Sequence, residues 1–177
     1  MNKETLAKRI AQTAVLHGEF TLRSGRSSSW YIDKYLFSTQ PDILASLGEM
    51  FTQYIPKTTT LLAGAELGGI PLVTTASMAS NLPCIFIRNQ KKDYGTAQQL
   101  EGVLKPADRV VIIEDVATTG GQVLEAASTI QESGATVEVI VAVIDRQEGA
   151  RENIEAAGFV FESLFVSKDL GISEAIS

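Results

Sequence analysis

Continuous apolar runs alternate with other segments along most of the chain. The runs are short and lack the polar positions of a half-exposed strand, which is typical of strands buried on both faces of a parallel sheet. They predict strands at residues 61–63, 84–87, 110–113, 137–144 and 159–166. The segments between them predict helices at residues 71–80, 122–133 and 150–157. Repeated strand–helix–strand units predict an α/β fold with a mostly parallel sheet flanked by helices.

The first 60 residues follow a different pattern. Leu6, Ile10 and Ala14 share one face of a helix that we expect from about residue 2 to residue 16, with Gly18 ending it. Two short strands around a turn are expected between residues 20 and 33. Pro41 suits the first turn of a second helix, because its missing N–H would have no partner there anyway.

Composition narrows the class of protein. With 177 residues, 45% hydrophobic and 20% charged, the chain fits one globular domain over residues 1–177. The net charge of −6 argues against non-specific binding of nucleic acid. The single cysteine, Cys84, lies in an apolar run, which predicts a buried thiol and a reducing compartment. No segment reaches the ~18 apolar residues of a membrane span, and none resembles a signal peptide. We therefore expect a cytoplasmic protein without a membrane partner.

The clearest chemical motif is the strand at 110–113, which is followed by Glu114, Asp115 and a turn of threonine and glycine. Ligands of open α/β sheets bind beyond the carboxyl ends of the strands, and N–H groups at the start of the next helix suit a phosphate. Two carboxylates beside a phosphate can hold sugar hydroxyls or a divalent cation. The alternative is an ordinary strand–turn–helix with solvated acids. A Walker P-loop is excluded, because no Gly-Lys-Ser/Thr follows.

Two basic sites also follow predicted strands. Arg88, Lys91 and Lys92 lie in a polar segment of about a dozen residues, which is long for a compact domain. Charge alone favours a solvated loop there, whereas loops of this length more often form functional lids. Arg146 comes directly after a buried strand, and it is either a surface ion-pair partner or a ligand for an anion.

The segment 110–121 resembles the phosphoribosyl-pyrophosphate motif of type I phosphoribosyltransferases, which is an apolar strand, two acids and a Thr/Gly loop. Further matches follow in order along nearly the whole chain and resemble the orotate phosphoribosyltransferase family. They are residues 20–28, 88–96, 100–102 and 145–148. The resemblance implies a type I fold with a small N-terminal hood. It also implies transfer of the phosphoribosyl group of 5-phosphoribosyl 1-diphosphate to orotate, giving orotidine 5′-phosphate and pyrophosphate in UMP synthesis.

The same resemblance implies roles for individual residues. Arg88, Lys92 and Asp115 would be the catalytic residues, and Glu114 would bind the ribose hydroxyls together with Asp115. Residues 64–69 would form the pyrophosphate loop. The other substrate-binding residues would be Arg23, Tyr31, Ile32, Tyr94, Val116, Ala117 and Arg146, the last on the orotate carboxylate, and Thr118, Thr119, Gly120, Gly121 and Gln122 around the 5′-phosphate.

The family pattern extends to the metal and to the assembly. Mg²⁺ would be bound mainly through the pyrophosphate and the ribose, because a hard cation prefers such oxygens, and no metal site made by the protein alone is expected. A homodimer is implied, in which the basic loop acts in the neighbour's site.

Three positions depart from the pattern. Asn89 and Gly68 stand where many members have lysine, and Tyr94 stands where many have histidine. Fewer cations near the pyrophosphate predict weaker stabilisation of the leaving group. Two alternatives stay open: a phosphoribosyltransferase for another base, against which Arg23 and Arg146 argue, and a non-catalytic regulator that binds the ribosyl pyrophosphate.

Overall fold

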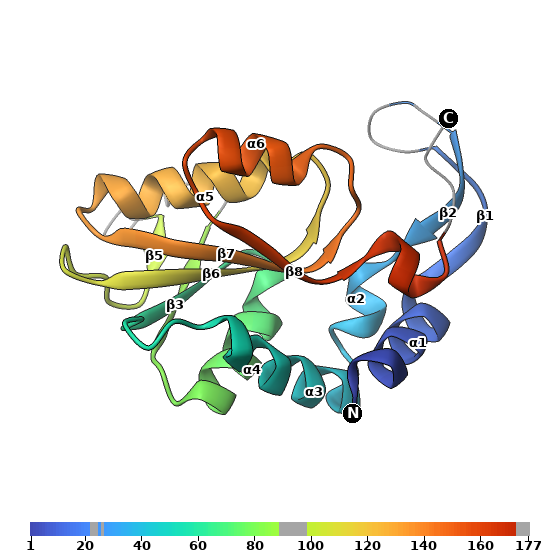
Figure 1. Ribbon diagram of the computed structural model, residues 1–177, viewed down its shortest axis with the longest axis horizontal. Helices are drawn as coiled ribbons and strands as arrows, with labels where there is room; N and C mark the ends of the chain where they lie inside the picture. Colours follow the sequence, from blue (N-terminus) through green and yellow to red (C-terminus); the bar gives the residue numbers. More distant parts are fainter. Residues whose placement is uncertain (22–24, 26, 89–98, 173–177) are drawn as a thin grey trace.

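A six-stranded sheet runs through the computed structural model, which describes residues 1–21, 25, 27–88 and 99–172 (Figure 1). The strand order is β5-β4-β3-β6-β7-β8. All neighbours pair in parallel except β5, which is antiparallel to β4. The strands are β3 (Leu61–Ala65), β4 (Cys84–Ile87), β5 (Leu100–Glu101), β6 (Arg109–Ala117), β7 (Thr136–Asp145) and β8 (Phe161–Val166).

Helices cover both faces of this sheet. Figure 1 shows α5 (Gly121–Glu132) and α6 (Ala150–Ala156) above it, and α3 (Pro41–Phe51) and α4 (Gly69–Ser80) below it. Alternate residues of β6 belong to different cores, because successive side chains of a strand point to opposite faces. Val111 and Ile113 pack with α3 and α4, whereas Val110 and Ile112 pack with α5 and α6. Burial on both faces explains why the central strands are continuous apolar runs.

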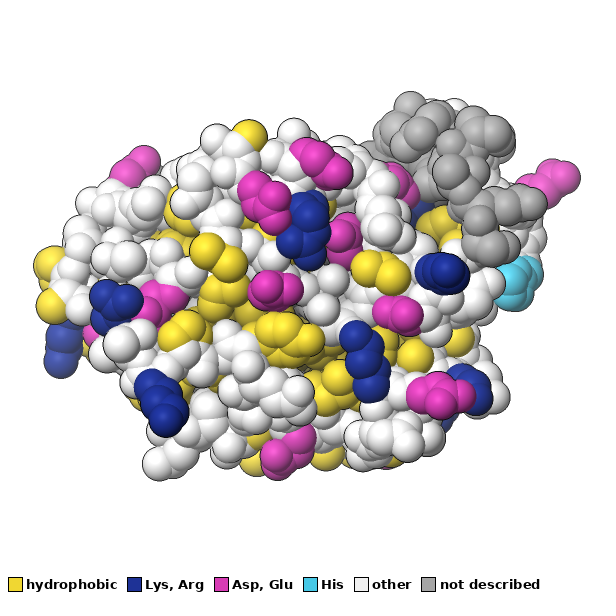
Figure 2. Space-filling view, viewed as in Figure 1, with side chains coloured by type: hydrophobic (Ala, Val, Ile, Leu, Met, Phe, Trp, Pro, Cys, Tyr) yellow, Lys and Arg dark blue, Asp and Glu magenta, His cyan; other side chains and the backbone are white. Residues whose placement is uncertain are grey.

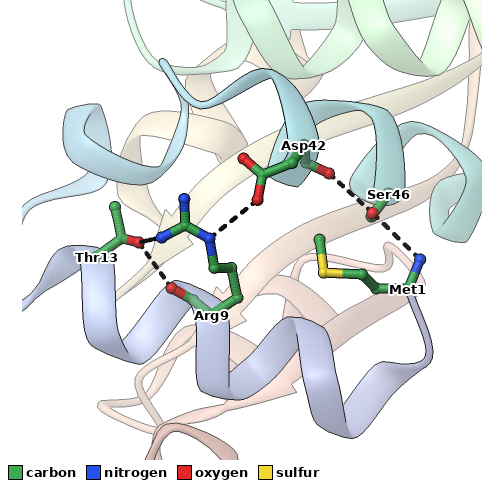
Figure 3. Close-up of polar contacts among 5 residues, drawn as sticks. All are labelled: Met1, Arg9, Thr13, Asp42 and Ser46. Carbon is green, nitrogen blue, oxygen red and sulfur yellow. Dashed lines mark hydrogen bonds and ion pairs between the residues drawn. The ribbon is translucent and has the colours of Figure 1, made fainter.

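The N-terminal segment forms a small hood at one end of the sheet. It comprises α1 (Lys3–Ala14), the antiparallel strands β1 (Val15–Thr21) and β2 (Ser27–Ile32), and the short helix α2 (Lys34–Phe37). Two polar contacts join α1 and the residues before it to α3: Arg9 Nε donates to Asp42 Oδ2 at 2.9 Å, and the amino group of Met1 donates to Ser46 Oγ at 3.4 Å (Figure 3). The short helices η1 (Thr52–Tyr54) and η2 (Ser167–Leu170) complete the described chain.

The predicted fold class is confirmed, but two element boundaries and the burial of Cys84 need correction. The first helix ends at Ala14, and Gly18 lies inside β1, because the backbone from Val15 onward pairs with β2. Strand β6 continues to Ala117, so the two acids lie within the strand, where β7 still pairs with it. Cys84 packs against the core but is only half-buried.

The surface mixes charges of both signs. Figure 2 shows lysine and arginine interspersed with aspartate and glutamate on one face, with hydrophobic side chains between them. Within the described ranges, no helix combines the length and the apolar character needed to cross a membrane.

A polar cluster closes the edge of the sheet where β6 and β7 begin. Glu138 on β7 is its centre, with only 6% of its side chain exposed. It accepts hydrogen bonds from Thr58 and Thr59, both at 2.6 Å, and from Arg109 Nε at 2.9 Å. Burial alone would raise the pKa of Glu138, but these hydrogen bonds and the charge of Arg109 outweigh it and lower the pKa.

We predict that Glu138→Gln lowers the free energy of unfolding by about 1–2 kcal/mol at pH 7, because hydrogen bonds to the charged carboxylate are lost. A depressed folded-state pKa stabilises the protein above the ordinary value of 4.5, and this contribution is lost as the pH falls through the folded-state value. Urea unfolding at pH 7, 5 and 4 should therefore show a deficit that shrinks below about pH 4.5. The exposed Glu155→Gln serves as the control, and a deficit independent of pH would contradict the prediction.

Candidate active site

The carboxyl ends of β4, β3, β6 and β7 bring the predicted site segments to one edge of the sheet. Ala65 lies opposite Ile87, and Ala117 lies opposite Asp145 in the strand register. The residues that follow these strands therefore share this edge, as ligand-binding residues do in open α/β sheets. They include Arg88, the loop 64–69, the turn after β6, and Arg146.

The carboxylate pair is buried at this edge. Glu114 is 8% exposed and Asp115 is 2% exposed. Asp115 Oδ2 lies 2.7 Å from Nζ of Lys34, and Asp115 Oδ1 accepts the N–H of Val116 at 2.5 Å. Glu114 Oε2 is buried and makes no hydrogen bond with the part of the chain that the structure describes.

The two carboxylates do not both carry a charge. Desolvation, and then the charge of Asp115 and a side-chain hydrogen bond with it, raise the pKa of Glu114 from 4.5 to about 8. Burial alone would lower the pKa of Lys34, but the charge of Asp115 and the hydrogen bond with it raise the pKa, so the ammonium stays charged. At neutral pH the pair therefore holds a proton, and its remaining negative charge faces one cation.

The turn between β6 and α5 offers backbone donors. Gly120 has a φ of 80°, and a Cβ there would lie 3.0 Å from Cγ1 of Ile154, so glycine is required. Asn153 Nδ2 donates to the backbone oxygen of Thr119 at 2.9 Å and fixes the turn from α6. No described side chain caps the first turn of α5. The N–H groups of this turn and the helix dipole suit a phosphate.

The loop 64–69 lies against the carboxylate pair. A Cβ at Gly68 would lie 1.6 Å from Asp115 Oδ2 and 3.3 Å from Lys34 Nζ, so a side chain cannot stand there while these two groups keep their positions. Gln122 Nε2 donates to the backbone oxygen of Glu66 at 3.4 Å. This contact joins the loop to α5, so the loops flanking the acids are held together.

Arg146 has a guanidinium edge that is buried and only partly satisfied by the described residues. Its side chain is 10% exposed, and its face stacks on the ring of Trp30 at 4.7 Å. Nε and Nη2 make no hydrogen bond to the described residues, although Glu148 Oε1 forms an ion pair with Nη2 at 2.8 Å. Nε and Nη2 are the two donors that bind a carboxylate in a bidentate manner. The backbone N–H of Arg146 is fixed by Ala117 O at 3.0 Å.

The remaining predicted residues lie at the periphery or outside the description. Arg88 is about one-third exposed and forms an ion pair with Glu101 Oε1 at 3.6 Å. On β2, Tyr31 is exposed and stacks near Phe20, whereas Ile32 is buried. Arg23, Lys92 and Tyr94, as well as Asn89, lie outside the described residues.

This fold, with its acidic strand, its two glycine-containing loops and its hood, defines a type I phosphoribosyltransferase. No family model matches the chain, but individual proteins do. Orotate phosphoribosyltransferase of Methanocella arvoryzae is 43% identical over 166 residues, covering 93% of this chain and 95% of the relative. The chain therefore belongs to the orotate phosphoribosyltransferase family.

Solved structures agree with this assignment. A crystal structure of Mycobacterium tuberculosis orotate phosphoribosyltransferase has a TM-score of 0.87 and 30% identity, covering 96% of this chain and 98% of that one. The same enzyme in complex with 5-phospho-α-D-ribosyl 1-diphosphate has a TM-score of 0.81 and 28% identity, with the same coverage.

Two hood residues at the site were not predicted from the sequence. These residues are Lys34 and Trp30. Lys34 reaches Asp115 and Trp30 reaches Arg146 across more than 80 and 110 positions of sequence respectively. The available hint was that both residues are close in sequence to Tyr31 and Ile32, which the family resemblance places among the substrate-binding residues.

We predict that the free energy of unfolding of the substrate-free Glu114→Gln variant increases relative to that of the wild type as the pH rises. A carboxyl whose folded-state pKa is raised stabilises the fold fully below its unfolded value of 4.5 and loses that contribution as the pH rises through about 8. The amide does not titrate, so it has no such loss of stability. The free energy of unfolding of the variant should therefore rise relative to that of the wild type by at most about 1.4 kcal/mol per pH unit across this window. Urea unfolding without substrate at pH 5.5, 7 and 8.5 measures the gain. The exposed Glu132→Gln is the control, and a difference that stays constant from pH 5.5 to 8.5 would refute the prediction.

Proposed function

We propose that this protein transfers the phosphoribosyl group of 5-phosphoribosyl 1-diphosphate to orotate, giving orotidine 5′-phosphate and pyrophosphate. The observation that carries the proposal is the guanidinium edge of Arg146, buried beside the acidic strand. The buried Nε has no hydrogen-bond partner among the described residues, and Nη2 pairs with Glu148. A substrate carboxylate would give Nε an acceptor and replace Glu148 on Nη2, which removes the cost of the unpaired donor. Orotate carries a carboxylate, whereas a purine base does not, so the edge favours orotate over other bases.

The sugar and its phosphate would occupy the strand end and the following turn. Glu114 and Asp115 would accept hydrogen bonds from the ribose hydroxyls. The N–H groups and hydroxyls of residues 118–122 would hold the 5′-phosphate at the start of α5. The loop 64–69, joined to α5 through Gln122, would offer its backbone amides to the pyrophosphate. Catalysis then consists of holding both substrates in line and stabilising charge as pyrophosphate leaves and a ring nitrogen of orotate attacks.

Magnesium would bind at this site together with the substrate and mainly through substrate oxygens. Among the described residues no group of three or more histidine, cysteine or acidic side chains could hold a metal. The orphaned Glu114 Oε2 and the Asp115 carboxylate are oxygen donors suited to Mg²⁺, but they leave most of its coordination to substrate oxygens. When bound, Mg²⁺ would neutralise charge on the leaving pyrophosphate.

The domain organisation, the location and the oligomeric state that we propose are those implied by the family resemblance. We propose a single domain over residues 1–177, a cytoplasmic location and a homodimer in which the loop containing Lys92 acts in the neighbour's site. Arg88 anchors this loop at the end of β4, where its N–H bonds Gln99 O at 2.8 Å. The comparison with orotate phosphoribosyltransferases, one of them bound to the ribosyl pyrophosphate, supports the substrates.

The activity is tested by mixing the protein with orotate, 5-phosphoribosyl 1-diphosphate and Mg²⁺ and following the pyrimidine absorbance. We predict that Arg146→Lys and Arg146→Ala weaken orotate binding, with a loss of about 2–5 kcal/mol for alanine, because the bidentate pair to a desolvated carboxylate is lost. Binding of the ribosyl pyrophosphate should change little.

Arg151→Lys is a matched control, because Arg151 also stacks on an aromatic ring, that of Phe161, but bonds the backbone at the amino end of β8. Calorimetry with orotate decides: unchanged affinity in Arg146→Ala would make Arg146 structural. Absence of turnover by the wild type with orotate would overturn the function itself.

The exchange of loops is tested by complementation. Lys92→Ala and Asp115→Asn should each be nearly inactive alone. If the loop acts in trans, one site of a mixed dimer combines both defects and the other has none, so random exchange should restore about a quarter of wild-type activity. Mixed dimers that form, as shown by differently tagged subunits, and stay inactive would place the loop in its own subunit's site.

A further inference from the structure

Lys34 is held at the carboxylate pair by the hood. Asp33 caps α2 by accepting the N–H of Tyr35 at 3.0 Å, and its own N–H bonds Ala14 O at 2.9 Å. The backbone of Lys34 is therefore fixed to the end of α1. Its ammonium lies 2.7 Å from Asp115 Oδ2, yet a third of the side chain remains exposed. The ammonium thus lies at the site at the end of a partly exposed stem, and lysine stems are intrinsically flexible.

The loop position that carries lysine in many family members has no room for a side chain in this protein while Asp115 and Lys34 keep their positions. A side chain at Gly68 would begin 1.6 Å from Asp115 Oδ2 and 3.3 Å from Lys34 Nζ. The Lys34–Asp115 pair therefore occupies the space where that side chain would start. A cation is still present beside the loop, but it comes from the hood.

A cation at this position would offset charge once substrate is bound. The free site is near balance, because Glu114 holds a proton and Asp115 faces Lys34. The ribosyl pyrophosphate adds several negative charges beside the same carboxylates, and glycine at position 68 contributes none to offset them. Ribose hydroxyls and Mg²⁺ are acceptable partners for Asp115, so Lys34 can exchange Asp115 for a substrate oxygen within the reach of its side chain.

We propose that Lys34 is a binding residue for the ribosyl pyrophosphate, supplying from the hood the cation that Gly68 lacks. In the free protein its ammonium neutralises Asp115, and in the complex it donates to the pyrophosphate. This inference rests on the proposed function for the identity of the ligand, but it does not depend on which base is the acceptor.

The test is binding of 5-phosphoribosyl 1-diphosphate with Mg²⁺, measured by calorimetry without any base. Lys34→Gln should weaken this binding roughly tenfold to a hundredfold, the range for one hydrogen bond to a charged group. Lys34→Arg should recover most of the affinity. The exposed Lys8→Gln, which removes an ion pair with Glu4 on α1, is the matched control and should bind like the wild type.

Kinetics separate binding from a structural role. In Lys34→Gln the KM for the ribosyl pyrophosphate should rise at least several-fold more than the KM for orotate, and a higher salt concentration should weaken binding less than in the wild type. A merely structural lysine would lower the melting temperature and affect both substrates alike. Affinity within twofold of wild type in Lys34→Gln, with Asp115→Asn clearly weakened, would overturn the proposal.

A second measurement does not depend on the neutral variant folding. Lysines of the wild type are labelled by reductive ¹³C-methylation, and the Lys34 signal is assigned by its absence in Lys34→Arg. The signal should shift with the ribosyl pyrophosphate and Mg²⁺ but not with orotate alone, and an unmoved signal at saturation would refute the contact. Wild-type protein that binds the ribosyl pyrophosphate but does not use orotate would sink the proposed function and leave this inference standing.

Discussion

The burial of two adjacent carboxyl groups at the end of β6 is the constraint around which this site is built. A lone buried carboxylate is costly, and two side by side cannot both ionise without compensation. The protein meets this constraint with a proton on Glu114, a backbone N–H on Asp115 and an ammonium from Lys34. Each of these partners is one that a ribose hydroxyl or a cation can replace, so the arrangement that makes the free state tolerable also prepares it for a ligand.

The hood takes part in meeting this constraint. It contacts the site at two points: Trp30 stacks on the face of Arg146, and Lys34 pairs with Asp115. One contact covers the face of a guanidinium and leaves its edge to Glu148, which a substrate carboxylate would replace, and the other brings a cation to the sugar side. Trp30 and Lys34, which are four positions apart in the sequence, therefore connect the proposed orotate side of the site to the sugar side. Because Trp30 lies on β2 and Lys34 at the start of α2, the two contacts keep a fixed spacing.

Much of the fold could be predicted because its central strands are buried on both faces. Continuous apolar runs such as the one ending at Ile113 indicate strands without ambiguity once helices alternate with them. The true end of β6 at Ala117 could not be predicted, because Glu114 and Asp115 are polar and only pairing with β7 keeps them in the strand. The helix beginning at Lys34 and the strand at residues 100–101 are too short for any periodicity to show.

The site was predictable only where a local motif carried it. The acidic strand and its Thr/Gly turn are contiguous, so sequence and family resemblance indicated them together. The pairing of Lys34 with Asp115 joins elements that are remote in sequence, and charge alone does not distinguish Lys34 from the solvated Lys8 on α1. The raised pKa of Glu114 likewise depends on burial that exists only after folding.

A cation supplied by the hood is not equivalent to one supplied by the loop. A lysine at position 68 would be fixed to the sheet through α4 and would be present whenever the sheet is folded. Lys34 is positioned instead through Asp33 and the end of α1, so its charge reaches the site only while the hood is packed against α3. Loosening the hood would therefore remove a cation from the sugar side and release Arg146 from Trp30 at the same time. The departure at Gly68 thus makes substrate binding depend on the docking of the N-terminal segment, a coupling that a loop lysine would not create.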